Sequence, residues 1–365
     1  MKYQIAVLPG DGVGPEVVAE SVKVLQALST AFPSLKLSFQ EHPAGANCYL
    51  QQGTDLPDAT LEACREADAV LFGSAGDPNV RFKDGTEIAP QLTLRFLLDL
   101  YAGIRPIRTF PGVPALLAGN PPIDYVIIRE NTEGLYASRG AGVRVGNETA
   151  VDNMVITRHG TERIARYAFE LAATRNGAPR DGKRRVTCVD KSNVLKSQAF
   201  FREIFNEVGE DFADIERDYA YVDAYTVYQV RKPDFYDVVV AENMFGDIIS
   251  DLAAATIGGM GLAPSGDVGD KHGIFQPSHG TAPDIAGQGI ANPIGQILSA
   301  GMMLRWLGQR NGDTDALSAA DVVDAAVADV LLDTAHHTPD LGGSARTPEV
   351  GDAIVDSISK ARIHT

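Results

Sequence analysis

The chain has 365 residues, 44% of them hydrophobic, so it can bury a large core in about two domains. Its 32 Lys and Arg against 48 Asp and Glu give a net charge of −16, which argues against sequence-independent nucleic-acid binding. The three cysteines are scattered, and no uncharged apolar span reaches about 18 residues, so we expect a cytoplasmic protein without a membrane partner.

Short β-branched runs alternate with longer amphipathic stretches, a pattern typical of an α/β fold. The predicted strands are residues 5–8, 69–72, 125–128, 185–189 and 238–241. The predicted helices are residues 15–28, 160–174 and 320–332, and Gly- and Pro-rich loops are expected at 73–79, 111–122 and 265–280. Since no linker is visible, we expect two domains joined by several chain crossings.

Residues 9–16 read PGDGVGPE, between the first predicted strand and helix. The glycines lack the GxGxxG spacing of a dinucleotide loop, and no P-loop sequence follows. A strand-to-helix turn, in which Pro15 starts the helix, is favoured over a nucleotide-binding loop.

Three arginines come next in the chain: Arg95, Arg105 just before Pro106, and Arg129, which ends a predicted strand. Each alone is typical of a solvated surface, but together in one cleft they would suit a dicarboxylic acid through paired, charge-assisted hydrogen bonds. Further on, residues 140–155 place valines among Gly and Asn, which is compatible with a protruding hairpin that pairs with another subunit or with an ordinary surface loop.

Asp247 and Asp251 follow an apolar strand in the sequence NMFGDIISD. On a helix the two carboxylates lie on one face, one turn apart, where they repel each other unless a cation lies between them. Oxygen ligands of this kind suit Mg²⁺ or Mn²⁺, and a solvated acidic face is the alternative.

Lys191 also follows a strand, where burial could lower its pKa toward that of a general base; a salt-bridged lysine is equally compatible. Asp223 offers another carboxylate. Residues 277–287 form a tight loop in which an acidic residue could hold ribose hydroxyls, or which is simply a structured turn.

These segments, in this order, resemble the β-decarboxylating dehydrogenases, which act on isopropylmalate, isocitrate, homoisocitrate and tartrate or malate. The similarity runs from Pro9 to about Asp352 and includes PGDGVGPE, RENTEGLY, VDKSNVL, NMFGDIISD, HGTAPDIAG and DLGG. It implies a doubly wound α/β fold of two domains, like that of isopropylmalate dehydrogenase and without a GxGxxG Rossmann loop. The implied domains are residues 1–105 with 258–365, and residues 106–257, with a dimer arm around 140–155.

The resemblance also implies roles for individual residues. Tyr136, Lys191 and Asp223 are implied as catalytic, and Asp223, Asp247 and Asp251 as ligands of Mg²⁺ or Mn²⁺. Substrate contacts are implied for Gln91, Leu92, Arg95, Arg105 and Arg129. Cofactor contacts are implied for Asn193, His279, Gly280, Asp284, Ile285 and Asn292. Lys191 and Asp223 would serve the active site of a neighbouring subunit, so a homodimer or higher even oligomer is expected.

Individual residues within the family motifs predict which cofactor and which class of substrate the protein uses. Asp284 can accept hydrogen bonds from a ribose but would repel a 2′-phosphate, so NAD is expected. Gln91 and Leu92 stand at the positions where family members contact the substituent at C3 of the malate skeleton. One is polar and one apolar, a pair that matches none of the residue patterns implied for isopropylmalate, homoisocitrate or isocitrate. Gln276 replaces a usual glutamate. The substrate is thus a small hydroxy di- or tricarboxylic acid, 3-isopropylmalate-like, with isocitrate, homoisocitrate, tartrate or D-malate as alternatives. A non-catalytic regulatory subunit is the alternative of another class.

Overall fold

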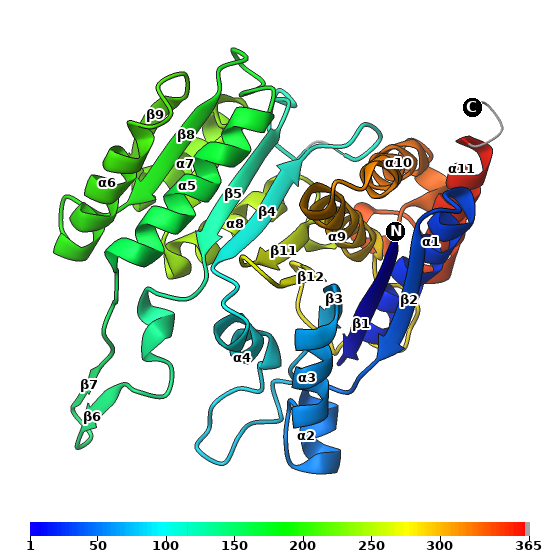
Figure 1. Cartoon of the computed structure of the whole chain (residues 1–365), viewed down its shortest axis with the longest axis horizontal. Coiled ribbons are helices and arrows are strands. Elements are labelled where there is room, and N and C mark those ends of the chain that lie inside the picture. The colour runs from blue at the N-terminus through cyan, green and yellow to red at the C-terminus, as the bar shows by residue number, and fades with distance from the viewer. Residues whose placement is uncertain (115, 362–365) are drawn as a thin grey trace. The chain divides into compact units, whose positions relative to one another are not determined.

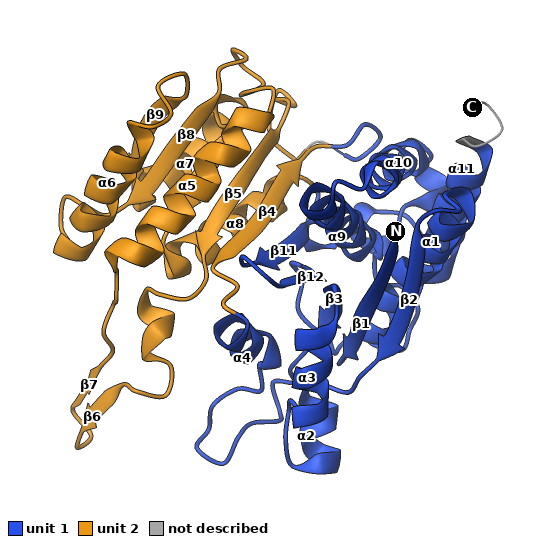
Figure 2. Cartoon of the chain, viewed as in Figure 1, with its two compact units in different colours: residues 1–98, 110–114, 258–365 blue, residues 99–109, 115–257 orange. Residues whose placement is uncertain are grey.

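The computed structural model describes residues 1–114 and 116–361, which form two compact units (Figure 2). Unit 1 contains Met1–Leu98, Phe110–Pro114 and the chain from Gly258 onward, and unit 2 contains Asp99–Thr109 and Ala115–Ile257. Residues 99–105, expected in the first domain, lie in unit 2, because strand β4 (Ala102–Arg108) pairs antiparallel with β5 (Asp124–Glu130) of that unit.

The strands of unit 1 follow the order β2-β1-β3-β12-β11. Their bounds are Lys36–Glu41, Lys2–Gly10, Ala69–Ser74, Gly273–Pro277 and Pro264–Val268. β1 pairs parallel with β2 and β3, and β12 pairs parallel with β3 and antiparallel with β11. Because β1 and β3 are parallel, both strands end at the same edge of the sheet, and the loops that follow them lie at that edge.

Helices α1 and α9 pack on this sheet, and α10 and α11 pack against them (Figure 1). The helices of unit 1 are α1 (Gly14–Ala31), α2 (Ala46–Gln52), α3 (Asp58–Glu66), α4 (Pro90–Leu97), α9 (Ile294–Asn311), α10 (Thr314–Val330) and α11 (Thr347–Ala361). α1 begins where Pro15 occupies its first turn, a position at which the missing N–H of proline costs no hydrogen bond. Short 3₁₀ turns lie at Met260–Leu262, Thr334–His336 and Pro339–Leu341.

In unit 2 the strand order is β4-β5-β10-β8-β9. β10 (Val238–Ala241) pairs parallel with β5 and with β8 (Arg185–Asp190), and β8 pairs parallel with β9 (Glu216–Tyr221). Every residue of β10 is fully buried. Such continuous β-branched runs are expected in parallel sheets that are covered on both faces.

The two faces of this sheet are covered by two helix pairs (Figure 1). α5 (Arg158–Thr174) packs against α6 (Lys196–Gly209), and α7 (Val222–Arg231) packs against α8 (Asn243–Thr256). The 3₁₀ turns Leu135–Ser138 and Pro233–Phe235 complete the unit. The mixed α/β class predicted from the sequence is confirmed in both units.

Residues 140–155 contain a two-stranded hairpin, the first of the two alternatives that the sequence left open. β6 (Val143–Val145) pairs antiparallel with β7 (Thr149–Val151), and all six residues of these strands are exposed. The base of the hairpin is held by a backbone bridge between Gly134 and Val155.

All predicted strands and helices form, but one predicted loop is wrong. Residues 265–280 contain most of β11 and all of β12, and both strands are buried. Gly266, Gly273 and Pro277, which suggested a loop, belong to the ladder, and Pro277 stands opposite Pro264 at its end. A proline is tolerated there because its missing N–H costs no hydrogen bond within the ladder. The helix predicted at 320–332 starts earlier, at Thr314, where Asp313 caps it.

No helix among the described residues combines the length and apolar character that crossing a membrane requires.

Candidate active site

Helix α8 presents the two carboxylates that the sequence singled out. The Glu242 side chain caps its N-terminus, accepting hydrogen bonds from the backbone N–H groups of Met244 and Phe245. Asp247 and Asp251 then lie one helical turn apart. Partial desolvation and the negative charge of Asp247 raise the pKa of Asp251, against the opposing effect of two arginines. A divalent cation would relieve this repulsion, so the pair fits the predicted metal.

Arg129 and Tyr136 both contact Asp247. The Arg129 guanidinium forms an ion pair with Asp247 Oδ1, and the Tyr136 hydroxyl donates to Oδ2 at 2.8 Å. The Arg129 Cζ atom also lies 5.3 Å from the centre of the Tyr136 ring. Each carboxylate oxygen keeps a second lone pair, so these contacts leave Asp247 able to bind a cation as well.

Sequence reasoning missed two residues that shape this cluster. Asn243 is fully buried, and its Oδ1 accepts from Arg129 Nε at 3.0 Å and Nη2 at 2.8 Å. Gly246 lies directly against Arg129, because an added Cβ would be 2.8 Å from the Arg129 Cβ. Both residues belong to the NMFGD run already noted, and that run was the available signal.

Arg105 lies on β4 and is buried, with 6% of its surface exposed. Its positive charge partly opposes the rise in the pKa of Asp251, as does that of Arg129. The structure therefore brings Arg105 and Arg129, two of the three predicted substrate arginines, near the α8 carboxylates. Since both guanidinium groups are largely removed from water, they suit a bound carboxylate.

Lys191 and Asp223 pair with each other. Lys191 Nζ lies 2.5 Å from Asp223 Oδ1, and this contact lowers the pKa of Asp223, which is 68% exposed. Among the described residues, no three His, Cys, Asp or Glu side chains gather as a metal site, so Asp223 does not join Asp247 and Asp251 within one chain. Asn193 lies close by in sequence and is exposed.

In unit 1, α4 carries Gln91, Leu92 and Arg95. Arg95 is buried and pairs through Nε with Asp267 Oδ2 at 2.9 Å. Gln276 Nε2 donates to the same carboxylate oxygen at 3.3 Å. This contact gives Gln276 a physical role, because a glutamate there would place a second buried carboxylate beside Asp267.

Gln91 is half-buried, and its Oε1 atom is the notable feature of α4. That oxygen is inaccessible to solvent and receives no hydrogen bond from any described residue. A buried acceptor without a donor costs free energy, which a ligand carrying an N–H or O–H group would recover. Leu92, next to it, is half-buried and apolar.

The residues predicted to hold adenosine lie in the loop after β12. His279 Nδ1 contacts the Gly280 carbonyl at 2.8 Å, so Nδ1 carries the proton and Nε2 is an acceptor. Burial lowers the pKa of His279, and Nε2 has no hydrogen-bond partner in the part of the chain that the structure describes. Asn292 donates to Asp340 Oδ2 at 3.1 Å. An unpartnered neutral imidazole fits a ligand that donates a hydrogen bond.

Two other residues of this loop differ in their surroundings. Asp284 is exposed, and its carboxylate is available to hydroxyl groups. Ile285 packs against a buried apolar cluster formed by Val13, Val17 and Ala291. The loop thus exposes the Asp284 carboxylate, while Ile285 packs it against the apolar cluster that includes α1 residues. This arrangement suits a nucleoside.

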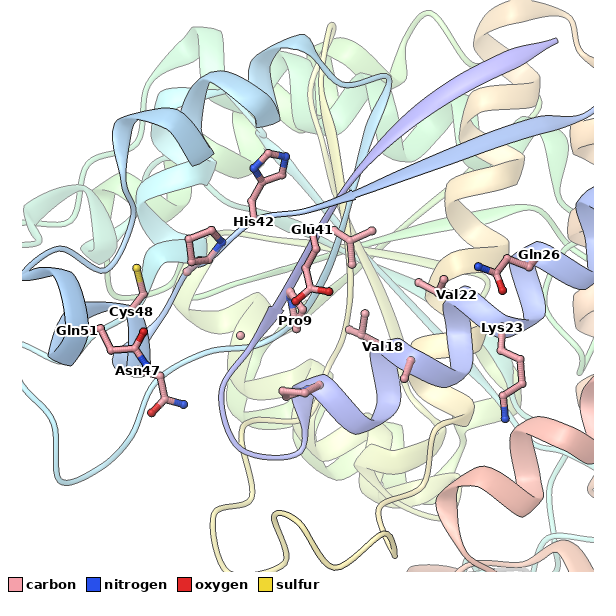
Figure 3. A pocket seen from close by; sticks show the side chains of 16 residues that line it. Pro9, Val18, Val22, Lys23, Gln26, Glu41, His42, Asn47, Cys48 and Gln51 are labelled. Atoms are coloured by element: carbon pink, nitrogen blue, oxygen red, sulfur yellow. The ribbon is translucent and has the colours of Figure 1, made fainter.

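A separate pocket of about 650 Å³ opens in unit 1 between β1, α1 and α2 (Figure 3). Val7, Val18 and Val22 contribute apolar walls, and Glu41 and His42 contribute polar groups. None of the predicted site residues lines this pocket. It is therefore distinct from the predicted site.

Known proteins resemble this chain over nearly its whole length. A family model described as isocitrate/isopropylmalate dehydrogenase matches residues 4–354. The 3-isopropylmalate/3-methylmalate dehydrogenase of Methanocaldococcus jannaschii is 44% identical over 98% of this chain and 99% of its own. The homoisocitrate dehydrogenase of the same organism is 40% identical over 98% of each chain. A crystal structure of isocitrate dehydrogenase from Methylococcus capsulatus matches with TM-score 0.85 and 36% identity, covering 98% of this chain and 99% of its own. Because the names differ in substrate, similarity alone leaves the substrate open.

Proposed function

Because the chain belongs to the isocitrate/isopropylmalate dehydrogenase family, we propose that it oxidises a 3-substituted malate with NAD and Mg²⁺ or Mn²⁺, releasing carbon dioxide. Family membership makes it a decarboxylating dehydrogenase that acts on the CH–OH group of a malate-type acid. The finer proposal rests on one observation: Arg129 and Tyr136 converge on Asp247, one helical turn from Asp251.

Arg105 and Arg129 are proposed to bind the substrate carboxylates. Both are buried on neighbouring strands, so their charge is poorly screened by water and each planar guanidinium can hold a carboxylate through two hydrogen bonds. Arg95 is proposed to assist from α4, with Asp267 and Gln276 fixing its orientation.

Asp247 and Asp251 are proposed to hold the divalent cation, together with Asp223 of a second copy. When bound, the cation would polarise the oxygen at C2 of the substrate and stabilise the negative charge that develops after decarboxylation. Lys191 of that second copy is proposed to accept the proton of the C2 hydroxyl. Tyr136, already hydrogen-bonded to Asp247, is proposed to deliver a proton to C3 of the enolate that remains.

The cofactor is proposed to bind along the loop that contains His279, Gly280, Asp284 and Ile285, with Asn292 beside it and Asn193 toward the nicotinamide. NAD would accept the hydride from C2. The exposed carboxylate of Asp284 favours NAD over NADP, since it can accept hydrogen bonds from ribose hydroxyls and would repel a 2′-phosphate.

The 3-substituent is proposed to face Gln91 and Leu92. A purely apolar group such as isopropyl would leave the buried Gln91 Oε1 without a donor. A substituent that carries a hydroxyl, as in tartrate, would satisfy this oxygen and makes tartrate the second candidate substrate. Isocitrate and homoisocitrate remain alternatives through the relatives' names alone.

A regulatory subunit without activity is the remaining alternative. Such a subunit has no need of catalytic side chains, yet the chain keeps Tyr136, Lys191, Asp223, Asp247 and Asp251. Their retention, and the contacts of Tyr136 and Arg129 with Asp247, favour a catalytic chain.

The test is NADH formation, followed by absorbance with Mn²⁺, over 3-isopropylmalate, 3-methylmalate, isocitrate, homoisocitrate, tartrate and malate. We expect turnover of at least one member. Gln91→Leu should raise kcat/KM for 3-isopropylmalate by roughly tenfold relative to tartrate, because it removes a buried unsatisfied polar group worth about 1–3 kcal/mol.

Gln51→Leu, at an exposed position of α2, is the matched control and should leave the preference unchanged. An unaltered preference in Gln91→Leu would remove Gln91 as the residue that reads the substituent. If the protein bound NAD and metal but turned over no member of the panel, the regulatory alternative would replace the proposal.

A further inference from the structure

The opening PGDGVGPE segment contacts the loop that follows β12 at two places. The Val13 backbone N–H donates to the Thr281 carbonyl at 2.9 Å. The Glu16 carboxylate accepts two backbone N–H groups, from Gly287 at 2.5 Å and from Gly289 at 2.9 Å. One side chain of α1 thus holds the far end of a loop that lies more than 270 residues later in the sequence.

The segment that carries Glu16 is itself fixed. Asp11 is buried, and its carboxylate accepts from the backbone N–H groups of Ala46 at 2.6 Å, Asn47 at 2.9 Å and Gly76 at 2.8 Å. Asp11 therefore ties the start of α1 to the N-terminus of α2 and to the loop after β3. Glu16 extends from a rigid base, so its carboxylate can define the position of whatever it binds.

The loop is shaped to meet this carboxylate. Gly287 and Gly289 have φ of +77° and +64°, a backbone conformation that L side chains rarely adopt. In that conformation both N–H groups point at Glu16. On the other side, Arg346 donates to the Gln288 carbonyl at 3.0 Å, and the Thr347 N–H donates to the Gly289 carbonyl at 2.9 Å.

We propose that Glu16 is a positioning residue for the cofactor: by holding Gly287 and Gly289 it keeps the 279–289 loop in the conformation that binds the adenosine half. Glu16 itself does not touch the cofactor. The inference rests on the proposed binding of NAD by this loop. When only a fraction of molecules holds the binding conformation, the apparent dissociation constant rises by the inverse of that fraction.

Two measurements test the proposal in the full-length protein. The first is amide hydrogen exchange over residues 280–289 without any ligand, and the second is the NAD dissociation constant from titration. Glu16→Gln keeps the size of the side chain but replaces one acceptor oxygen with an NH₂ group. That group cannot accept a hydrogen bond from one of the two backbone N–H donors. We expect exchange at Gly287 and Gly289 to become at least about tenfold faster, and NAD to bind about tenfold more weakly.

Kinetics separate positioning from catalysis. In Glu16→Gln the KM for NAD should rise about tenfold, while kcat at saturating NAD and the KM for the hydroxy acid stay near wild type. Glu16→Asp keeps the charge on a shorter side chain and should give an intermediate effect. Glu41→Gln, which neutralises an exposed carboxylate in the same unit (Figure 3), is the control and should change neither measurement.

Unchanged loop exchange and NAD affinity in Glu16→Gln would overturn the proposal. Tighter NAD binding would also overturn it, because it would mean that Glu16 acts by repelling the cofactor phosphates. If the wild-type protein binds no NAD, the proposed function fails. Faster exchange at Gly287 and Gly289 in ligand-free Glu16→Gln would then still establish that Glu16 orders the loop.

Discussion

Glu130 stands between Arg129 and the turn that leads to Tyr136. Its carboxylate is 1% exposed and accepts from the Thr132 N–H and hydroxyl and from the Glu133 N–H. Burial raises the pKa of Glu130 to about 7, although these hydrogen bonds oppose the shift. The neutral form is therefore favoured in the folded protein over much of the acidic range.

The raised pKa makes the free energy of unfolding depend on pH. Because the pKa is higher in the folded than in the unfolded chain, stability is greatest below about 4.5 and falls as pH rises toward about 7. Between pH 5 and pH 8 this group should lower the free energy of unfolding by about 2 to 3 kcal/mol.

Glu130→Gln cannot ionise, so urea unfolding should show the variant gaining about that amount on wild type between pH 5 and pH 8. Glu203→Gln, at an exposed site on α6, is the control and should follow wild type. If Glu130→Gln and wild type kept a constant difference over this range, Glu130 would not titrate there.

At the residue scale, the spacing of residues in the sequence predicted which side chains share one face of a helix. It could not predict contacts between different helices and strands. The four-residue step from Asp247 to Asp251 was enough to place both carboxylates on one face of a helix. The partner of Arg95 could not be found in this way, because Asp267 lies 172 residues later on a strand that the sequence did not predict. The role of Gln276 was hidden for the same reason.

The β6–β7 hairpin shows how local contacts hold an exposed element in place. The Glu133 carboxylate accepts from the Thr157 N–H at 2.8 Å and from its hydroxyl, just beyond the hairpin. The Ser138 hydroxyl donates to the Asn153 carbonyl at 2.6 Å across its base. A fixed base and an exposed tip are what an arm for a second copy of the chain requires.

The two strands of the hairpin carry exposed valines, whose contact with water is unfavourable. Val143, Val145 and Val151 are 55%, 63% and 45% exposed. Changing all three to Ser should convert the proposed dimer into a folded monomer, seen as half the mass in light scattering with an unchanged circular dichroism spectrum. Activity should fall by more than about tenfold, because Lys191 and Asp223 are proposed to act across the dimer.

Leu50→Ser, at a 66% exposed position in unit 1, is the control and should remain dimeric and active. A triple variant that keeps its mass and activity would rule out the hairpin as the dimer arm.

At the element scale, hydrophobic periodicity found the buried parallel strands and the amphipathic helices. β10 is the clearest case, since Val238–Ala241 is apolar throughout and fully buried. β11 and β12 were missed because they are short and contain Gly and Pro, residues that are more common in turns. β11 and β12 pair with each other across a short turn, and β12 also pairs with β3, which lies far earlier in the sequence.

At the scale of the whole molecule, the distribution of charge matters more than its sum. The chain has a net charge of −16, yet Arg95, Arg105 and Arg129 are all at least 94% buried. Because water screens buried guanidinium groups poorly, their positive electrostatic potential stays strong nearby even when the net charge of the protein is negative. Net charge therefore argues against sequence-independent nucleic-acid binding but not against an anionic substrate.

The proposed chemistry draws on both units. The carboxylates, Lys191 and Tyr136 lie in unit 2, whereas the proposed adenosine loop and α4 lie in unit 1. Composition and element order could predict two α/β domains. The roles proposed for the site residues came from the resemblance, because no local sequence pattern relates residues so far apart in the chain.

The most direct test of the proposed reaction is the ratio of carbon dioxide to NADH formed from the preferred substrate, with Mn²⁺ and then with excess EDTA, in wild type and in Asp247→Asn. We predict one carbon dioxide per NADH, loss of both products in EDTA, and a fall of at least roughly 100-fold in the folded Asp247→Asn variant. NADH without carbon dioxide, or turnover that survives EDTA, would contradict metal-dependent oxidative decarboxylation.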